Sequence, residues 1–363
     1  MSRLHASVLF LTKYSRNGAS SRYRTYQYLP LLKEAGVNFQ VIPLFTEAYL
    51  EKSYQTGKRN FVDILNGFIQ RIACLVKVRN FELVAIEYEL FPYLPALPER
   101  FLGWLGIPYL VDYDDALFHQ YDQHTSWYVR FLLRNKIARV MQGAHLVTVG
   151  NSYLADYAKL AGAKHVEIIP TVVDLSHYTM NEYDLREKQE NFVIGWIGSP
   201  STKRFIEQLV PSLTEVCKEG GTNLRLIGAG FVNMPNIPLE SIKWEEDTEI
   251  EWLKSFDVGI MPLSDTPWTR GKCGLKLIQY MACGLPVVAS PVGVNKEIVE
   301  HGINGFLAET DEEWVQAIST LKDNPELRKR MGEAGRHKVE EKYSLQVTAP
   351  RLIKLIRSLQ GNN

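Results

Sequence analysis

Two cations and two glycines stand directly before an amphipathic segment in the second half of the chain. Arg270, Gly271, Lys272 and Gly274 open a helix that is predicted over 274–283, because apolar residues recur there at three- and four-residue spacing. A helix N-terminus carries partial positive charge and unpaired N–H groups, and glycines allow a ligand to approach the backbone closely. The combination predicts a diphosphate site, and a solvated basic loop is the alternative.

Carboxylates end two apolar runs in the first half of the chain. Asp112, Asp114 and Asp115 end one run, and Glu87 and Glu89 end another. Alternation along a strand directs Asp112 and Asp114 to one side and Asp115 to the other. One interpretation is a metal-binding Asp-x-Asp pair, and an aspartate that caps the following turn is the structural alternative.

Short runs rich in valine and isoleucine, separated by helical segments, supply the elements that position these groups. They predict parallel strands buried on both faces, and therefore an α/β fold. The runs are SVLFLT, NFQVIPLF, FELVAIEYEL, PYLVDYDDALF, HLVTVG and VEIIPTVVD in the first half, and NFVIGWIG, NLRLIGAG, SIKW, DVGIMPL, LPVVASP and FLAE in the second. Two successive Rossmann-like domains with parallel sheets are expected to face a central cleft at the carboxyl ends of their strands.

A polar stretch without apolar periodicity divides the two series of strands. It predicts an N-terminal domain over 1–177, a linker over 178–190 and a C-terminal domain over 191–343. The apolar face of the last stretch, 344–363, indicates a terminal helix.

Composition narrows the classes of protein. Lys and Arg number 41, as do Asp and Glu, so no global field attracts nucleic acid and no nucleic-acid partner is expected. The four cysteines are scattered, which is typical of reduced thiols. The apolar run near the start is too short for a signal or spanning helix, so a cytoplasmic protein is expected.

The segment GLKLIQYMACGLPVVASPVGVNKEIVEHGINGFL resembles the C-terminal signature of family 4 glycosyltransferases, which have the GT-B fold. The glycine loop NGASSRYR after the first strand agrees with the same family. The resemblance covers nearly the whole chain and is strongest over 255–310. It also implies that the terminal helix crosses back to the N-terminal domain.

The resemblance implies a retaining transfer of a sugar from a nucleotide-diphosphate sugar to a glycan or lipid-linked acceptor, as in polysaccharide biosynthesis. It implies no metal and no cofactor besides the sugar nucleotide. The aspartates at 112, 114 and 115 would act near the transferred sugar. The donor-binding residues would be Gly18, Ser199, Lys203, Arg270, Lys272, Gly274, Leu275 and Gln279, and the acceptor-side residues Arg22, Arg24, Glu87 and Glu89.

The chain departs from the family's pattern at three positions. The family usually has two glutamates where this chain has Gly271 and Gln279, and an arginine where it has Ser199. Gln279 can still exchange hydrogen bonds with a ribose, but Gly271 offers no side chain. A nucleotide-sugar epimerase on the same fold and a non-catalytic partner subunit that binds nucleotide-sugar are therefore the rival functions.

Two segments mix cations with large apolar residues, at 60–79 and 126–142. A core helix with a charged outer face explains each of them. The alternative is a helix at a membrane surface, which would make the protein peripheral on the inner face of the membrane and bring it to a lipid-linked acceptor.

Overall fold

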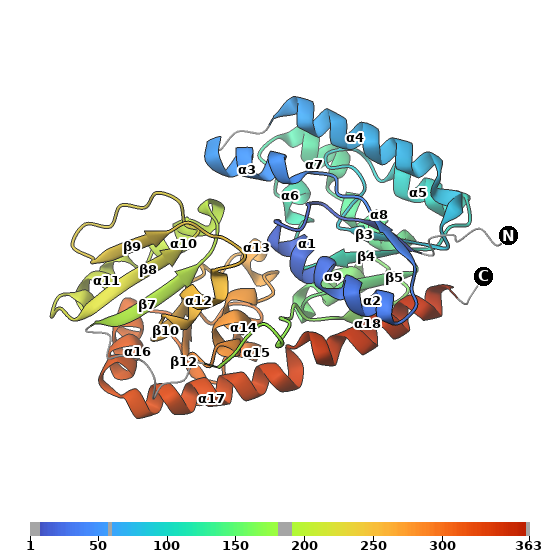
Figure 1. Ribbon diagram of the computed structural model, residues 1–363. Helices are drawn as coiled ribbons and strands as arrows, with labels where there is room; N and C mark the ends of the chain where they lie inside the picture. The colour runs from blue at the N-terminus through green and yellow to red at the C-terminus, as the bar shows by residue number, and fades with distance from the viewer. Residues whose placement is uncertain (1–7, 57–59, 181–190, 361–363) are drawn as a thin grey trace. The chain divides into compact units, whose positions relative to one another are not determined.

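A computed structural model of the protein describes residues 8–56, 60–180 and 191–360, and two six-stranded parallel sheets organise them (Figure 1). The strand order is β2-β1-β3-β4-β5-β6 in the first sheet and β12-β11-β10-β7-β8-β9 in the second. The first sheet has β1 (Val8–Leu11), β2 (Phe39–Val41), β3 (Leu83–Glu87), β4 (Tyr109–Tyr113), β5 (Leu146–Val149) and β6 (Val166–Ile168). The second has β7 (Phe192–Ile197), β8 (Thr222–Ile227), β9 (Leu239–Ile242), β10 (Val258–Met261), β11 (Val287–Ala289) and β12 (Gly305–Leu307). Both are doubly wound sheets, as the apolar runs predict.

The chain divides into two compact units, one around each sheet. The first unit takes the described residues up to Thr171, the short segment Arg270–Cys273 and the described residues from Thr348 onward. The second unit takes the described residues of Val172–Thr269 and Gly274–Val347. Most of the predicted linker, 181–190, lies outside the described residues, and Tyr178 at its start is buried in the second unit.

Helices cover both faces of the first sheet, and two asparagines fix where two of them begin. Asn60 accepts a hydrogen bond from Val62 N at 3.1 Å, and Asn151 accepts one from Leu154 N at 3.0 Å, so each side chain satisfies a backbone donor of the first turn. The helices are α1 (Ala19–Arg24), α2 (Leu29–Glu34), α3 (Glu47–Thr56), α4 (Phe61–Val76), α5 (Leu97–Trp104), α6 (His119–Asp122), α7 (Trp127–Leu133), α8 (Lys136–Gly143) and α9 (Ser152–Leu160).

The second sheet is covered in the same way, and Trp196 and Trp314 are both almost fully buried in its core. Its helices are α10 (Lys203–Glu207), α11 (Val210–Cys217), α12 (Glu249–Lys254), α13 (Pro267–Arg270), α14 (Leu275–Ala282), α15 (Asn295–Ile298), α16 (Asp311–Asp323) and α17 (Pro325–Lys342). The last helix, α18 (Leu345–Gln360), starts in the second unit and continues in the first.

Helix α14 is held directly against the second sheet by Tyr280. A Cβ atom on Gly259 of β10 would lie 2.3 Å from the Tyr280 ring, so only glycine permits this approach. The Tyr280 hydroxyl accepts a hydrogen bond from Ile197 N at 3.0 Å. Tyr280 therefore fixes α14 against β10 and against the carboxyl end of β7.

Among the described residues, no helix has the length and apolar character that crossing a bilayer requires.

Candidate functional site

In the first unit, the polar side chains gather at the carboxyl ends of β3 and β4. Glu87 and Asp112 are register partners on these neighbouring strands. Because carboxyl ends of parallel strands meet at one edge of a sheet, Asp114 and Asp115 follow at the same edge. The structure thus brings the predicted carboxylates of the two strands together.

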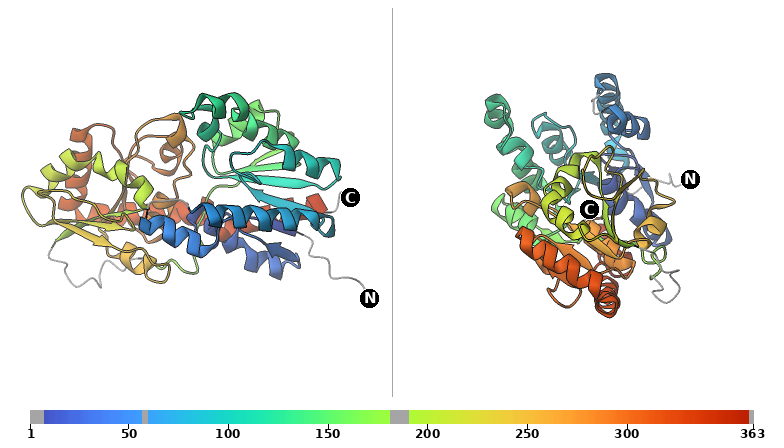
Figure 2. Two further views of the ribbon diagram at one scale, coloured as in Figure 1. Left: turned by 90° about the horizontal axis from the view of Figure 1, so that it is seen from above. Right: turned by 90° about the vertical axis from the view of Figure 1, so that its left-hand side faces the viewer.

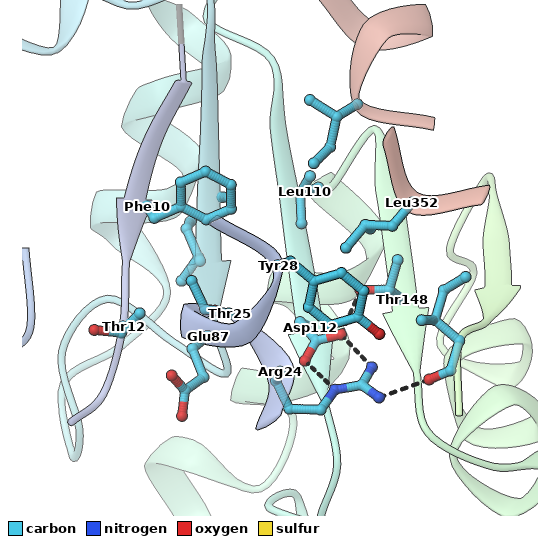
Figure 3. Close-up of a pocket in the computed structure, with 14 residues that line it drawn as sticks. Phe10, Thr12, Arg24, Thr25, Tyr28, Glu87, Leu110, Asp112, Thr148 and Leu352 are labelled. Atoms are coloured by element: carbon cyan, nitrogen blue, oxygen red, sulfur yellow. Dashed lines mark hydrogen bonds and ion pairs between the residues drawn. The ribbon is translucent and has the colours of Figure 1, made fainter. Parts of the chain in front are cut away.

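Asp112 is held by Arg24, which lies at the end of α1. Arg24 Nη2 and Nε donate to the two carboxylate oxygens at 2.6 and 2.8 Å, and Nη1 donates to Ile169 O at 2.6 Å (Figure 3). Thr148 Oγ1 donates to the same carboxylate at 2.6 Å. Burial by itself lowers the pKa of Arg24, but the charge and hydrogen bonds of Asp112 raise it above its ordinary value. The guanidinium is 2% exposed and paired with Asp112, and its role at an anionic acceptor stays a prediction.

Glu87 is a buried carboxyl with one oxygen bound and one unbound. Its Oε2 accepts hydrogen bonds from Ser21 Oγ at 2.6 Å and from Lys13 N at 3.1 Å, whereas Oε1 is buried and accepts none. Burial raises the pKa of Glu87 to about 7, and the charge of Asp114 adds to the rise. Glu87 can therefore hold or release a proton near neutral pH.

Tyr88 and Asp114 directly follow β3 and β4 at this edge of the sheet. Tyr88 has a φ of 64°, an uncommon conformation for a residue other than glycine, and its hydroxyl donates to Asp114. Burial and then the charge of Asp115 raise the pKa of Asp114. The ordinary alternation along a strand does not govern Asp114 and Asp115, since β4 ends at Tyr113.

Lys272 belongs to the first unit and pairs with Asp115. Its Nζ lies 2.8 Å from Asp115 Oδ1, and this charge raises the pKa of Lys272 against the opposing effect of burial. Asn151 Nδ2 holds the segment by donating to Gly271 O and Lys272 O, each at 3.0 Å. The sequence predicts Lys272 as a cation for a diphosphate, whereas here its charge is shared with a carboxylate.

Gly271 has no room for a side chain. A Cβ atom there would lie 2.5 Å from Ala116 Cβ and 2.7 Å from Ala116 N. The position that resembles the family's first glutamate is thus closed by the backbone of the loop after β4. Arg270, in contrast, is exposed, and its charge lowers the pKa of Tyr153 against the larger effect of burial.

The other predicted residues of the first unit have mainly internal contacts. Glu89 pairs with Lys136 and accepts a hydrogen bond from Tyr121 OH at 2.7 Å. Arg22 is buried and lies over the Tyr23 ring. Gly18 caps α1 where a Cβ atom would lie 2.4 Å from Tyr14 Cβ.

A cavity of about 30 Å³ lies beneath the Arg24–Asp112 pair (Figure 3). Phe10, Tyr28 and Leu352 line it together with these two charged residues. This volume suits about one water molecule, so the cavity is too small for a sugar. Leu352 also shows that α18 completes the core of the first unit.

In the second unit, glycine loops follow β7 and β8 at the carboxyl edge. A Cβ atom on Gly228, whose φ is 75°, would lie 2.4 Å from Gly198 O, so the two loops meet backbone to backbone. Ser199 follows Gly198 and forms a capping box with Thr202. Such an edge presents backbone rather than side chains to a ligand.

Lys276 is a residue of this edge that the sequence analysis does not select. It lies in the first turn of α14 and its Nζ stands 4.5 Å from the centroid of the Trp196 ring. The helix dipole disfavours a cation in a first turn. That unfavourable placement is the sequence signal that could have identified Lys276.

Gln279 and Lys203 have partners inside the second unit. Gln279 is buried, and its Nε2 donates to Glu249 Oε1 at 2.7 Å. Glu249 also accepts from Trp244 Nε1, so α12 places a carboxylate beside the position that resembles the family's second glutamate. Lys203 Nζ donates to Phe231 O at 3.1 Å.

Gly274 and Leu275 shape the start of α14. Gly274 is its N-cap with a φ of 70°, and a Cβ atom there would lie 2.2 Å from Ile298 Cδ1. Leu275 is the first helical residue and is partly exposed. Gly274 thus allows the start of α14 to pack closely against α15.

Within the described ranges, no group of three or more His, Cys, Asp or Glu side chains is arranged to hold a metal ion. Two of the three aspartates at the end of β4 already pair with cations of the chain, Asp112 with Arg24 and Asp115 with Lys272.

Comparison with known structures defines the fold. Sucrose-phosphate synthase from Thermosynechococcus elongatus superposes with a TM-score of 0.73 at 17% identity, over 98% of this chain and 100% of that chain. The Anabaena protein Alr3699/HepE, solved in complex with UDP-glucose, gives a TM-score of 0.68 at 17% identity, over 98% and 100% of the two chains. The protein has the GT-B fold, with two Rossmann-like parallel-sheet domains, that these structures share.

Sequence comparison finds similarity to glycosyltransferases, mainly in the second unit. Residues 191–324 match the sequence model described as "Glycosyl transferases group 1". N-acetyl-alpha-D-glucosaminyl L-malate synthase from Bacillus anthracis is 30% identical over 174 residues, which are 45% of this chain and 44% of that protein. An uncharacterized glycosyltransferase from Methanocaldococcus jannaschii is 27% identical over 255 residues, or 61% and 69% of the two chains.

The alignments with the first curated relatives are partial. They span 44% of the malate synthase, 19% of a probable sucrose-phosphate synthase from Thermosipho melanesiensis and 21% of spore coat protein SA from Bacillus subtilis.

Proposed function

We propose that this protein is a glycosyltransferase that moves a sugar from a nucleotide-diphosphate sugar to a glycan or lipid-linked acceptor with retention of configuration. One observation carries the proposal. The match to group 1 glycosyl transferases falls on the second unit, whose sheet edge presents glycine loops and a lysine in the first turn of α14. Backbone amides, a helix dipole and a cation together suit a diphosphate.

The donor diphosphate lies, in this proposal, against the loops at Gly198–Ser199 and Gly228–Gly230 and the first turn of α14. Lys276 faces it with positive charge, and the glycines let the phosphates approach the backbone. Gln279 and Glu249 support the ribose side of the same edge, Gln279 by orienting the carboxylate that it binds. Lys203, Arg270 and Lys272 stay predicted donor contacts.

Catalysis would be mainly electrostatic. As the bond between sugar and diphosphate breaks, negative charge grows on the leaving phosphate, and Lys276 with the amides of α14 stabilises it without a metal or a further cofactor. On the acceptor side, Glu87 offers a carboxyl whose pKa of about 7 lets it exchange a proton with an acceptor hydroxyl. Asp112, Asp114 and Asp115 are assigned to the transferred sugar, where their carboxylates would accept hydrogen bonds from sugar hydroxyls besides the contacts that they already have within the unit.

The function is tested by incubating the protein with labelled UDP-, GDP- and ADP-sugars and a panel of acceptors. A transferred sugar with an unchanged anomeric configuration, seen by NMR of the product, supports the proposal. An epimerised donor identifies the rival epimerase, and binding without turnover identifies a non-catalytic partner subunit.

Metal independence has its own test. Activity should survive EDTA, because cations of the protein meet the phosphate charge. If EDTA abolishes turnover and Mn²⁺ restores it, the aspartates at 112, 114 and 115 become candidate metal ligands. The same proposal puts the protein in the cytoplasm, where sugar nucleotides are made.

A further inference from the structure

The outer face of α4 is apolar along its whole length. Phe61, Leu65, Ile69, Ile72 and Val76 are between 49% and 80% exposed. Their spacing of four, four, three and four residues places them on one side of the helix. A helix that packs on a core normally turns such a stripe inward, so this stripe needs a partner outside the unit.

Two more helices of the first unit also expose large apolar side chains. These helices are α5 and α7, and the right-hand view of Figure 2 shows α4 and α7 rising at opposite edges of the same end of the unit. We call this surface the apolar face. It consists of Phe61, Val62, Leu65, Ile69, Ile72 and Val76 of α4, Leu97, Phe101 and Trp104 of α5, and Trp127, Tyr128, Phe131 and Leu132 of α7.

The loop after β3 joins the helices of the apolar face. Arg71 of α4 approaches Leu90 O at 3.5 Å and donates to Thr12 O at 2.6 Å, and Lys136, which follows α7, donates to Phe91 O at 2.5 Å. This loop begins directly after Glu87, the proposed acceptor-side carboxyl. The apolar face and the acceptor side are thus built on one segment of the first unit.

Cations predominate among the charges around the apolar face. The exposed charged side chains on or next to these helices are Lys77, Arg79, Arg100, Arg130 and Arg134, with Glu82 as an exposed acid in the segment after α4. Within the described α4, α5 and α7, the acidic side chains are Asp63, which is half-buried, and Glu99, which is buried and accepts from Leu90 N. Large apolar side chains, Trp and Tyr, and flanking cations are the composition of a surface that binds an anionic bilayer.

We propose that the apolar face docks the protein on the surface of an anionic lipid bilayer, with α4, α5 and α7 entering the interface between headgroups and acyl chains. The proposal rests on the proposed function, because docking there brings the acceptor side of the first unit to a lipid-linked acceptor. The flanking cations contact the headgroups, and the aromatic side chains of α7 lie at the polar boundary.

A second copy of the chain fits the apolar face less well. In a symmetric dimer the same patch meets itself, so Arg130 and Arg134 of one copy would approach the cations of the other without acids to neutralise them. The second unit also offers no matching patch among its described residues, where the exposed large apolar side chains are the scattered Met180, Phe231, Ile303 and Val347.

Cosedimentation with vesicles tests the proposal, using phosphatidylcholine alone and phosphatidylcholine mixed with phosphatidylglycerol. The protein should partition onto the anionic vesicles and detach as salt is raised. Phe131→Ser combined with Leu132→Ser should weaken this partition by on the order of a hundredfold, since two large apolar side chains leave the interface. Arg130→Gln should weaken it roughly fivefold, the factor that corresponds to ~1 kcal/mol per cation.

Phe231→Ser is the matched control, since Phe231 is a strongly exposed phenylalanine of the second unit. It should leave partition unchanged. Failure to bind anionic vesicles, or equal loss in the control, would overturn docking. So would a dimer that forms without lipid and dissociates in the Phe131 and Leu132 variant. The measurement needs no donor or acceptor, so it separates failure of docking from failure of the proposed transfer reaction.

Discussion

The two sheets of this protein end in edges of opposite character. The first carries side-chain charge that is already matched inside the unit, with Arg24 on Asp112 and Lys272 on Asp115. The second presents glycine loops and a helix start whose polar groups are backbone amides, with Lys276 as a cation of its first turn. The difference shows that the same kind of sheet edge can present either paired charged side chains or backbone amides.

Side-chain ion pairs within the unit and backbone amides at a helix N-terminus suit different ligands. Matched charges fix carboxylates in place, so the lone pairs that remain on their oxygens can accept from neutral hydroxyls without a net field. Backbone amides and a dipole attract an anion and leave little side chain to displace. The contrast favours a sugar or acceptor hydroxyl at the first edge and a diphosphate at the second.

The largest effect is expected from breaking the buried pair of the first edge. Asp112→Asn leaves the buried Arg24 guanidinium without a counter-charge and should lower the free energy of unfolding by about 3–5 kcal/mol. Urea unfolding measures it. Glu240→Gln is the matched change in the second unit, where Glu240 pairs with Arg225 at the surface, and it should cost less than about 1 kcal/mol. Equal costs would contradict the view that burial makes the Arg24–Asp112 pair the more important of the two.

Donor affinity separates the two lysines. Lys276→Ala should weaken nucleoside-diphosphate binding by about 1.5–3 kcal/mol, the range for a charged hydrogen bond. Lys272→Ala should weaken it less, because Asp115 already neutralises Lys272. Calorimetry with UDP, GDP and ADP gives both values. A larger loss of affinity in Lys272→Ala would indicate that the diphosphate binds beside the segment before Gly274.

The close packing at Gly271 is tested by adding a single methyl group and measuring stability. Gly271→Ala should destabilise the protein by about 1–3 kcal/mol, because the new methyl group meets Ala116 at 2.5 Å. Gly103→Ala is the control, since nothing lies within 4 Å of a Cβ atom there and alanine favours the helix. If thermal melts show Gly271→Ala to be as stable as the unmodified protein, this position is open to the family's glutamate after all.

The smallest change per step of the measured variable is a pH dependence from Glu87. Its pKa is raised to about 7, so the folded state keeps a proton that the unfolded chain releases at lower pH. Stability should therefore fall as pH rises towards 7, by at most ~1.4 kcal/mol per pH unit, and level off above it. Glu87→Gln imitates the protonated form and should remove this slope. A slope that persists in Glu87→Gln assigns the titration to another group.

Much of the architecture follows from local patterns. The apolar runs located the strands of both sheets, because a buried parallel strand needs an unbroken apolar segment. The helix predicted over 274–283 is α14, Leu275–Ala282, since its apolar spacing matches its buried face. The sequence also places carboxylates at two strand ends of the first sheet, and the pairing of β3 with β4 brings Glu87 beside Asp112.

The sequence by itself determined the fold class, the carboxylates at the end of β4 and the signature segment around α14. Only the tertiary structure decided the partners of the charges, because partners lie far apart in the chain: Lys272 meets Asp115 and Arg24 meets Asp112. It also decided that Gly271 is closed, that Glu249 stands beside Gln279 and that the stripe on α4 faces outward. Apolar periodicity says that a helix has an apolar side, but what covers that side depends on packing between segments that no local pattern records.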